Sequence, residues 1–135
     1  MARAEGSPTI SDEADSAAAA GDFARALRLL EQAIEREQGS IELWMKLSAM
    51  RRAAGDLGGA LQSVEKALAL APLDFSGLLS RAVLLERLGD LSAGEAFNRA
   101  LAQLPPDGRI PPAMNKAVEP ARRKAAEHQA AVESR

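Results

Sequence analysis

Some kinds of residue are scarce in this 135-residue chain, and each shortage excludes a class of function. There is no cysteine, which excludes disulfides, thiol nucleophiles and thiolate metal sites. The single histidine, His128, cannot supply the two histidines of a non-haem iron site. The sequence also shows no serine–histidine–aspartate pattern and no glycine-rich phosphate loop. We therefore predict that the chain is not an enzyme and has no catalytic residue, no metal and no cofactor.

The chain also has little net charge and no long apolar run. Its formal net charge is −2, so it lacks the basic character typical of nucleic-acid binding. No apolar stretch approaches the roughly 20 residues that span a bilayer. The first ten residues contain no apolar segment of a secretory signal. We expect a cytoplasmic protein that binds neither nucleic acid nor membrane.

What the sequence does contain is a short motif that recurs every 34 residues. The three copies are Gly21-Asp22-Phe23, Gly55-Asp56-Leu57 and Gly89-Asp90-Leu91. Aromatic residues make up only 3% of the chain, so alanine and leucine must supply most of the buried surface. A repeat of this period predicts pairs of helices that stack on one another, with each glycine ending the first helix of a pair.

The second repeat, residues 40–72, shows the helical pattern most clearly. Apolar residues at helical spacing predict a first helix that ends near Ala54 and a second that runs from about Leu57 to Pro72. The apolar positions of the second helix recur 34 residues earlier, in the first repeat. The first helix of that first repeat, roughly residues 9–20, has a thin apolar stripe, so we expect it to fray or to pack loosely.

The third repeat, residues 74–105, keeps the pattern with one residue fewer. Its second helix matches the earlier ones when it is shifted by 33 residues, which places Ala93 and Phe97 in the core. A strict shift of 34 would instead place Gly94 and Asn98 there. Because glycine and asparagine bury little apolar surface, we predict the shift of 33.

These residues resemble the signature of the tetratricopeptide repeat. The matching residues are Trp44, Leu47, Ala60, Val64, Ala67 and Pro72. Ser48 and Arg51 stand where the signature has glycine and tyrosine. The resemblance covers residues 7–106, as repeats over about 7–38, 40–72 and 74–105. It implies an all-α fold, an α-solenoid of three tetratricopeptide helical hairpins with a C-terminal capping helix.

The C-terminal segment is predicted to cap this stack. Residues 107–112 predict a loop, and residues 113–134 predict a helix rich in alanine, arginine and glutamate. Pro120 lies inside that helix and is expected to kink or break it. A last helix with a polar outer face would cover the exposed end of the repeats. The alternative is a connector toward another domain or subunit.

The family resemblance also implies a partner-binding surface. In tetratricopeptide stacks the first helix of each repeat lines a concave groove, and the residues predicted to face it are Met45, Ala49, Arg52, Leu79, Val83 and Glu86. Met45 and Ala49 stand where some family members have the lysine and asparagine that clamp the C-terminal carboxylate of heat-shock chaperones. That clamp is therefore predicted to be absent. The mixed apolar and charged lining suits an amphipathic helix or an extended peptide.

The predicted function is a protein–protein interaction scaffold whose groove binds a protein or peptide partner. One alternative is a self-association or spacer module, which would make the chain a homo-oligomer. Another follows from residues 43–52 and 84–89, which resemble the repeat region preceding some bacterial aspartyl/asparaginyl β-hydroxylases. That resemblance implies the regulatory repeat portion of such an enzyme, with the catalytic domain absent.

Three further features each have two interpretations. Trp44 is predicted to pack within its hairpin rather than to bind a partner. His128 is predicted to lie at the surface or to fill the cap rather than to act as a ligand or a pH switch. The basic run 122–124 is predicted to be solvated, with contact to phosphate or to an acidic partner as the alternative.

Overall fold

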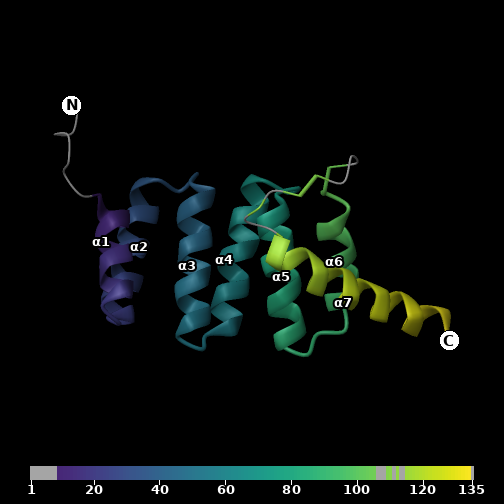
Figure 1. Cartoon of the computed structure of the whole chain (residues 1–135). Coiled ribbons are helices and arrows are strands. Elements are labelled where there is room, and N and C mark those ends of the chain that lie inside the picture. The colour runs from purple at the N-terminus through teal and green to yellow at the C-terminus, as the bar shows by residue number, and fades with distance from the viewer. Residues whose placement is uncertain (1–8, 106–108, 111, 113–114, 135) are drawn as a thin grey trace. The chain divides into compact units, whose positions relative to one another are not determined.

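The computed structural model of the chain is built from α-helices (Figure 1). It describes residues 9–105, 109–110, 112 and 115–134. The helices are α1 (Ile10–Ala19), α2 (Phe23–Arg36), α3 (Ile41–Ala53), α4 (Leu57–Leu70), α5 (Phe75–Arg87), α6 (Ala93–Leu101) and α7 (Asn115–Glu133). Over these described residues, none of the helices has both the length and the apolar character that crossing a bilayer requires. The chain divides into two compact units, unit 1 (Met1–Ala67) and unit 2 (Leu68–Arg135).

Polar side chains and glycines in the sequence determine where the helices begin and end. The residues whose side chains accept a hydrogen bond from a backbone N–H in the first turn of α1 to α5 are Thr9, Asp22, Ser40, Asp56 and Asp74. Such a cap contributes about 1 kcal/mol to helix stability. The turns after α1, α3 and α5 contain Gly21, Gly55 and Gly89, with φ of 82°, 86° and 74°. These turns require glycine, because other residues rarely adopt a positive φ.

A core cluster of unit 1 lies among α1, α2 and α3. Its buried residues are Ala14, Leu30, Ala33, Ile34, Leu43 and Leu47. Ala14 is only 1% exposed and Ala17 only 5%, so α1 is packed closely along this face. The expectation that α1 packs loosely was therefore wrong. Alanine lets helix axes approach to roughly 8–10 Å, so a stripe of small residues is enough for close packing.

Hydrogen bonds from polar side chains join α3 to α4 within unit 1. Ser48 Oγ donates to the backbone oxygen of Ala60 at 2.9 Å, and Arg51 Nη1 donates to Ser63 Oγ at 2.9 Å. Arg51 also forms an ion pair with Glu31 of α2, at 3.8 Å. The two residues that depart from the repeat signature, Ser48 and Arg51, therefore bond across neighbouring helices. Ser48 and Ser63 are buried, and each has a hydrogen-bond partner, which offsets the cost of burying a hydroxyl group.

In unit 2, α5 pairs with α6, and α7 packs against α6. Phe75, Ala100 and Val118, one from each helix, form a buried cluster. The predicted register of α6 is confirmed, because Phe97 is 3% exposed whereas Asn98 is exposed. Ala93, at 8% exposed, also lies in the core.

The last helix, α7 (yellow in Figure 1), runs from Asn115 to Glu133 without a break, although Pro120 lies inside it. Proline removes one N–H donor from the helix, but the remaining residues continue the helical ladder. A break near Pro120 is therefore absent from the structure, and a kink there stays a prediction. The buried residues of α7 are Val118, Ala121 and Ala125, which recur at helical spacing. Parts of the predicted loop (107–112) and of the predicted start of the last helix lie outside the described residues, namely 107–108, 111 and 113–114.

Gly94 of α6 lies directly under the side chain of His128 of α7. A Cβ atom at Gly94 would overlap His128, so the absence of a side chain permits this close approach. We expect Gly94→Ala to destabilise the chain, because His128 and the turn of α7 around it must move away. Gly58→Ala in α4 is the matched control, since a Cβ there meets nothing within 4 Å. Gly58→Ala should raise the free energy of unfolding by about 0.5–1 kcal/mol.

Urea denaturation followed by circular dichroism measures both glycine variants. Equal stabilisation by Gly94→Ala and Gly58→Ala would show that His128 can leave its position at no cost.

Candidate partner-binding surface

The six residues predicted to face a partner lie on two helices, one in each unit. The α3 surface consists of Met45, Ala49 and Arg52, and the α5 surface consists of Leu79, Val83 and Glu86. Each set has the spacing i, i+4, i+7, which places its members on one face of a helix. Arg52 and Glu86 are exposed, whereas the four apolar residues are half-buried. Each surface therefore combines an apolar strip with one charge at its end.

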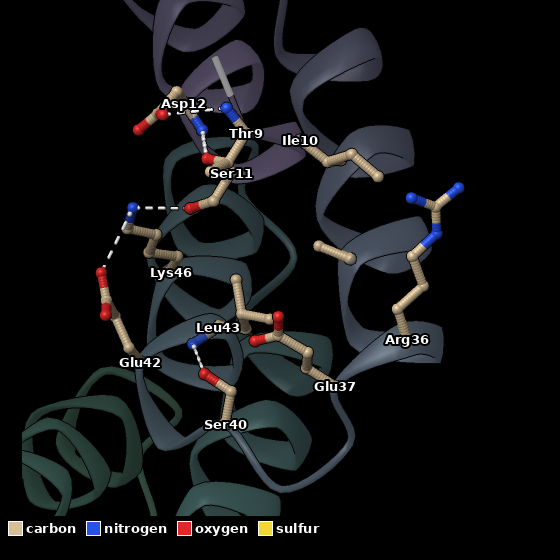
Figure 2. A pocket seen from close by; sticks show the side chains of 11 residues that line it. Thr9, Ile10, Ser11, Asp12, Arg36, Glu37, Ser40, Glu42, Leu43 and Lys46 are labelled. Carbon is tan, nitrogen blue, oxygen red and sulfur yellow. Dashed lines mark hydrogen bonds and ion pairs between the residues drawn. The ribbon is translucent and has the colours of Figure 1, made fainter. Parts of the chain in front are cut away.

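Lys46 connects α3 to α1 beside the α3 surface (Figure 2). Its Nζ lies 2.8 Å from Ser11 Oγ and 3.5 Å from Glu42 Oε1. It also lies 3.0 Å from Asp15 Oδ2. Burial disfavours the charged ammonium group. The hydrogen bond to Asp15 and the charges of Asp15 and Glu42 outweigh this effect, so the pKa of Lys46 is raised. Lys46 therefore stays protonated at neutral pH, and the contact between α1 and α3 keeps its charge.

A cavity of about 390 Å³ opens in unit 1 between the start of α1, the end of α2 and the start of α3 (Figure 2). Its charged lining residues are Asp12, Arg36, Glu37, Glu42 and Lys46. The volume is within the range of ligand pockets, but such pockets are lined mainly by apolar and aromatic side chains. Because the lining contains both acidic and basic groups, it does not single out a ligand of one charge.

In unit 2, an ion pair joins the chain's own C-terminal helix to one residue of the α5 surface, and a second residue packs against a buried cluster. Leu79 packs against the apolar cluster that includes Val118 of α7. Glu86 Oε2 lies 3.3 Å from Nζ of Lys124, also on α7. Leu79 and Glu86 were predicted to face a partner, and in this structure Leu79 packs against the buried cluster and Glu86 pairs with α7.

Trp44 is half-buried and packs against the core cluster of unit 1, whose residues come from α1, α2 and α3 and not from α4, the other helix of its hairpin. Its indole Nε1 donates to the backbone oxygen of Gln38 at 3.0 Å. In the basic run, Arg122 and Arg123 are exposed, but Lys124 forms the ion pair described above. The sequence did not predict this ion pair. A short basic run does not indicate which carboxylate, distant in the sequence, one of its side chains contacts.

Comparison with models of protein families found one match. The model is described as tetratricopeptide repeat, and it matches residues 11–74 and 51–108. A comparison with curated protein sequences found no significant match.

Solved structures with a similar fold include proteins in complex with peptides. The Yersinia enterocolitica type III secretion chaperone SycD, in complex with a peptide of the translocator YopD, is 14% identical, with a TM-score of 0.77 and 89% of each chain covered. PcrH, known from Pseudomonas aeruginosa, in complex with the chaperone binding region of PopD, is 20% identical, with a TM-score of 0.74, covering 90% of this chain and 89% of that one. The first TPR of Spaghetti (RPAP3), bound to an HSP90 peptide, is 13% identical, with a TM-score of 0.71, covering 87% of this chain and 89% of that one. At these identities the similarity is one of fold.

Proposed function

Because this chain belongs to the tetratricopeptide repeat family, we propose that it is a protein–protein interaction scaffold that binds a peptide or a helical segment of a partner. The observation that carries the proposal is the α3 surface, where half-buried Met45 and Ala49 lie on the same helix face as the exposed Arg52. The peptide complexes of SycD, PcrH and Spaghetti, which share the fold, support the same kind of ligand. The proposed role is non-catalytic and cytoplasmic.

The side chains of the α3 surface suit a partner segment that is apolar with an acidic residue beside it. The flexible thioether of Met45 adapts to apolar side chains of different shapes. Ala49 is small, so a partner's backbone can come close to α3. Arg52 presents several N–H donors that match the geometry of a carboxylate or of backbone carbonyl groups. The ion pair of Lys46 with Asp15 borders this surface and offers further polar contacts.

We expect the double variant Arg52→Glu/Val83→Glu to bind its partner at least about tenfold more weakly, a loss of about 1.4 kcal/mol. The reason is that one substitution reverses the charge on the α3 surface and the other puts a carboxylate into the apolar strip of the α5 surface. Partners captured by the tagged wild-type chain are identified by mass spectrometry, and the dissociation constant is then measured for each protein.

The control is Arg28→Glu/Lys66→Glu, which reverses two exposed charges on α2 and α4. It should bind as the wild type does. Circular dichroism first establishes that both double variants are folded. Undiminished binding by a folded Arg52→Glu/Val83→Glu protein would remove both surfaces from the proposal.

The two alternatives from the sequence remain predictions. Light scattering tests self-association, because a stable homo-oligomer in the absence of any partner would favour a self-association or spacer role. None of the matches described above is a hydroxylase. The length of the native reading frame tests that resemblance, since a regulatory portion requires a catalytic domain in the same polypeptide.

A further inference from the structure

The helix α7 packs on α6 and reaches the α5 surface at Glu86. Its Lys124 pairs with Glu86, and its Val118 belongs to the cluster against which Leu79 packs. Leu79 and Glu86 are two of the three residues of the α5 surface. A partner that binds Glu86 must therefore compete with Lys124 of α7.

The pattern of α7 shows what kind of helix the surface accepts. Its buried residues, Val118, Ala121 and Ala125, have the spacing i, i+3, i+7 and are 2%, 1% and 6% exposed. Lys124 adds a positive charge that meets Glu86 beside this stripe. His128, one turn after Ala125, covers Gly94. The surface formed by α5 and α6 therefore accommodates a narrow helix with small apolar side chains and one basic residue.

The contacts that hold α7 on unit 2 are weak. Two of its three buried side chains are alanines, which bury little apolar area compared with Phe97 of α6. Lys124 and Glu86 are 43% and 40% exposed, so water weakens their attraction. Residues 129–134 are all exposed and add nothing to the packing. Release of α7 therefore costs less than unfolding of unit 2, and local opening of this kind is common at chain ends.

We propose that α7 is an internal ligand of the α5–α6 surface and that an amphipathic helix of a partner protein displaces it. That helix has small apolar residues at the spacing i, i+3, i+7 and a basic residue that pairs with Glu86. The inference rests on the proposed scaffold function and specifies the partner class for unit 2. Binding at this surface is then regulated by the chain itself, because α7 must leave before the partner enters.

The test uses a fluorescent synthetic peptide with the sequence of residues 115–134 and the full-length chain. In the variant Ala121→Glu/Lys124→Glu the chain's own α7 is weakened, while α5 and α6 are unaltered. By fluorescence anisotropy, the peptide should bind this variant at least about tenfold more tightly than the wild type. In the wild type, α7 is tethered and competes at a high effective concentration.

A charge reversal tests the pairing with Glu86. A peptide carrying Lys124→Glu should bind the variant chain more weakly than the unmodified peptide does. It should bind more tightly to a chain that carries Ala121→Glu and Glu86→Lys and keeps its own Lys124, because only the peptide can then pair with the new lysine. The matched control is a peptide carrying Arg123→Glu, which makes the same charge change at an exposed position and should bind as the unmodified peptide does. Equal binding by the two altered peptides, or no peptide binding to a folded variant, would overturn the inference.

Hydrogen exchange on the full chain carrying only Lys124→Glu gives a second test if the double variant does not fold. We expect faster exchange of the α7 amides, with α5 and α6 unchanged, and unchanged exchange in α7 would contradict the inference. The peptide assay needs no natural partner, so its outcome is independent of the capture experiment. Partner capture that depends on Arg52 and Val83, together with a failed peptide assay, would overturn this inference alone.

Discussion

Replacing Phe97 with alanine is expected to lower the free energy of unfolding by about 3–5 kcal/mol. Phe97 is 3% exposed and is one of only three phenylalanines in the chain. Removing its ring leaves a cavity beside α6. This helix of 9 residues packs against both α5 and α7. The neighbouring buried residues of α6 are alanines, which are too small to refill the space. Since domains of this size are typically stable by about 5–15 kcal/mol, the loss takes a large share of the total.

The matched control for Phe97→Ala is Phe23→Ala. Phe23 is the first residue of α2 and is 38% exposed, so its replacement removes the same atoms with much less loss of burial. Urea titration followed by circular dichroism at 222 nm measures the difference between the variants. An effect of Phe97→Ala no larger than that of Phe23→Ala would mean that α6 does not depend on this side chain.

The second large effect is expected for Leu47→Ala, which should lower the free energy of unfolding by about 2–5 kcal/mol. Leu47 belongs to the core cluster of unit 1 and is 2% exposed. On the same helix face its neighbours include Leu43, and the facing α2 contributes Leu30 and Ile34. Truncation at this position therefore removes contacts that α2 and α3 share.

Leu73→Ala is the control for Leu47→Ala, because Leu73 precedes α5 and is 69% exposed. It should change stability by less than about 0.5 kcal/mol, as is usual for surface substitutions. Thermal and urea unfolding of the two variants gives the comparison. A loss for Leu47→Ala that matches the one for Leu73→Ala would contradict the assignment of the unit 1 core.

The sequence predicted the helices of the repeats because local chemistry determines their ends. Gly55 has the positive φ that its place after the first helix indicated, and Asp56 accepts the N-terminal hydrogen bond of α4. The register of α6 was predicted for a similar reason, since only one shift buried Phe97 and left Asn98 exposed. These features depend on residues close together in the sequence, so a single sequence is enough to predict them.

Contacts between residues far apart in the sequence were harder to predict. The pairing of Lys124 with Glu86 depends on where α7 lies on α5 and α6, and charge alone does not select that partner. Gly94 was predicted to be a poor core residue. Its lack of a side chain, however, leaves the space that His128 occupies. The packing of α1 was underestimated because its small residues give a weak periodic signal. Whether the α3 and α5 surfaces bind a partner stays a prediction.

The indole of Trp44 gives this chain an intrinsic optical reporter. Trp44 is the only tryptophan, it is half-buried, and it is adjacent in sequence to Met45 of the α3 surface. Its emission wavelength depends on how much water reaches the ring and on the hydrogen bond from Nε1 to Gln38. A ligand that reaches the ring or moves α3 would alter this environment, so such binding is measurable from native fluorescence without attaching a dye.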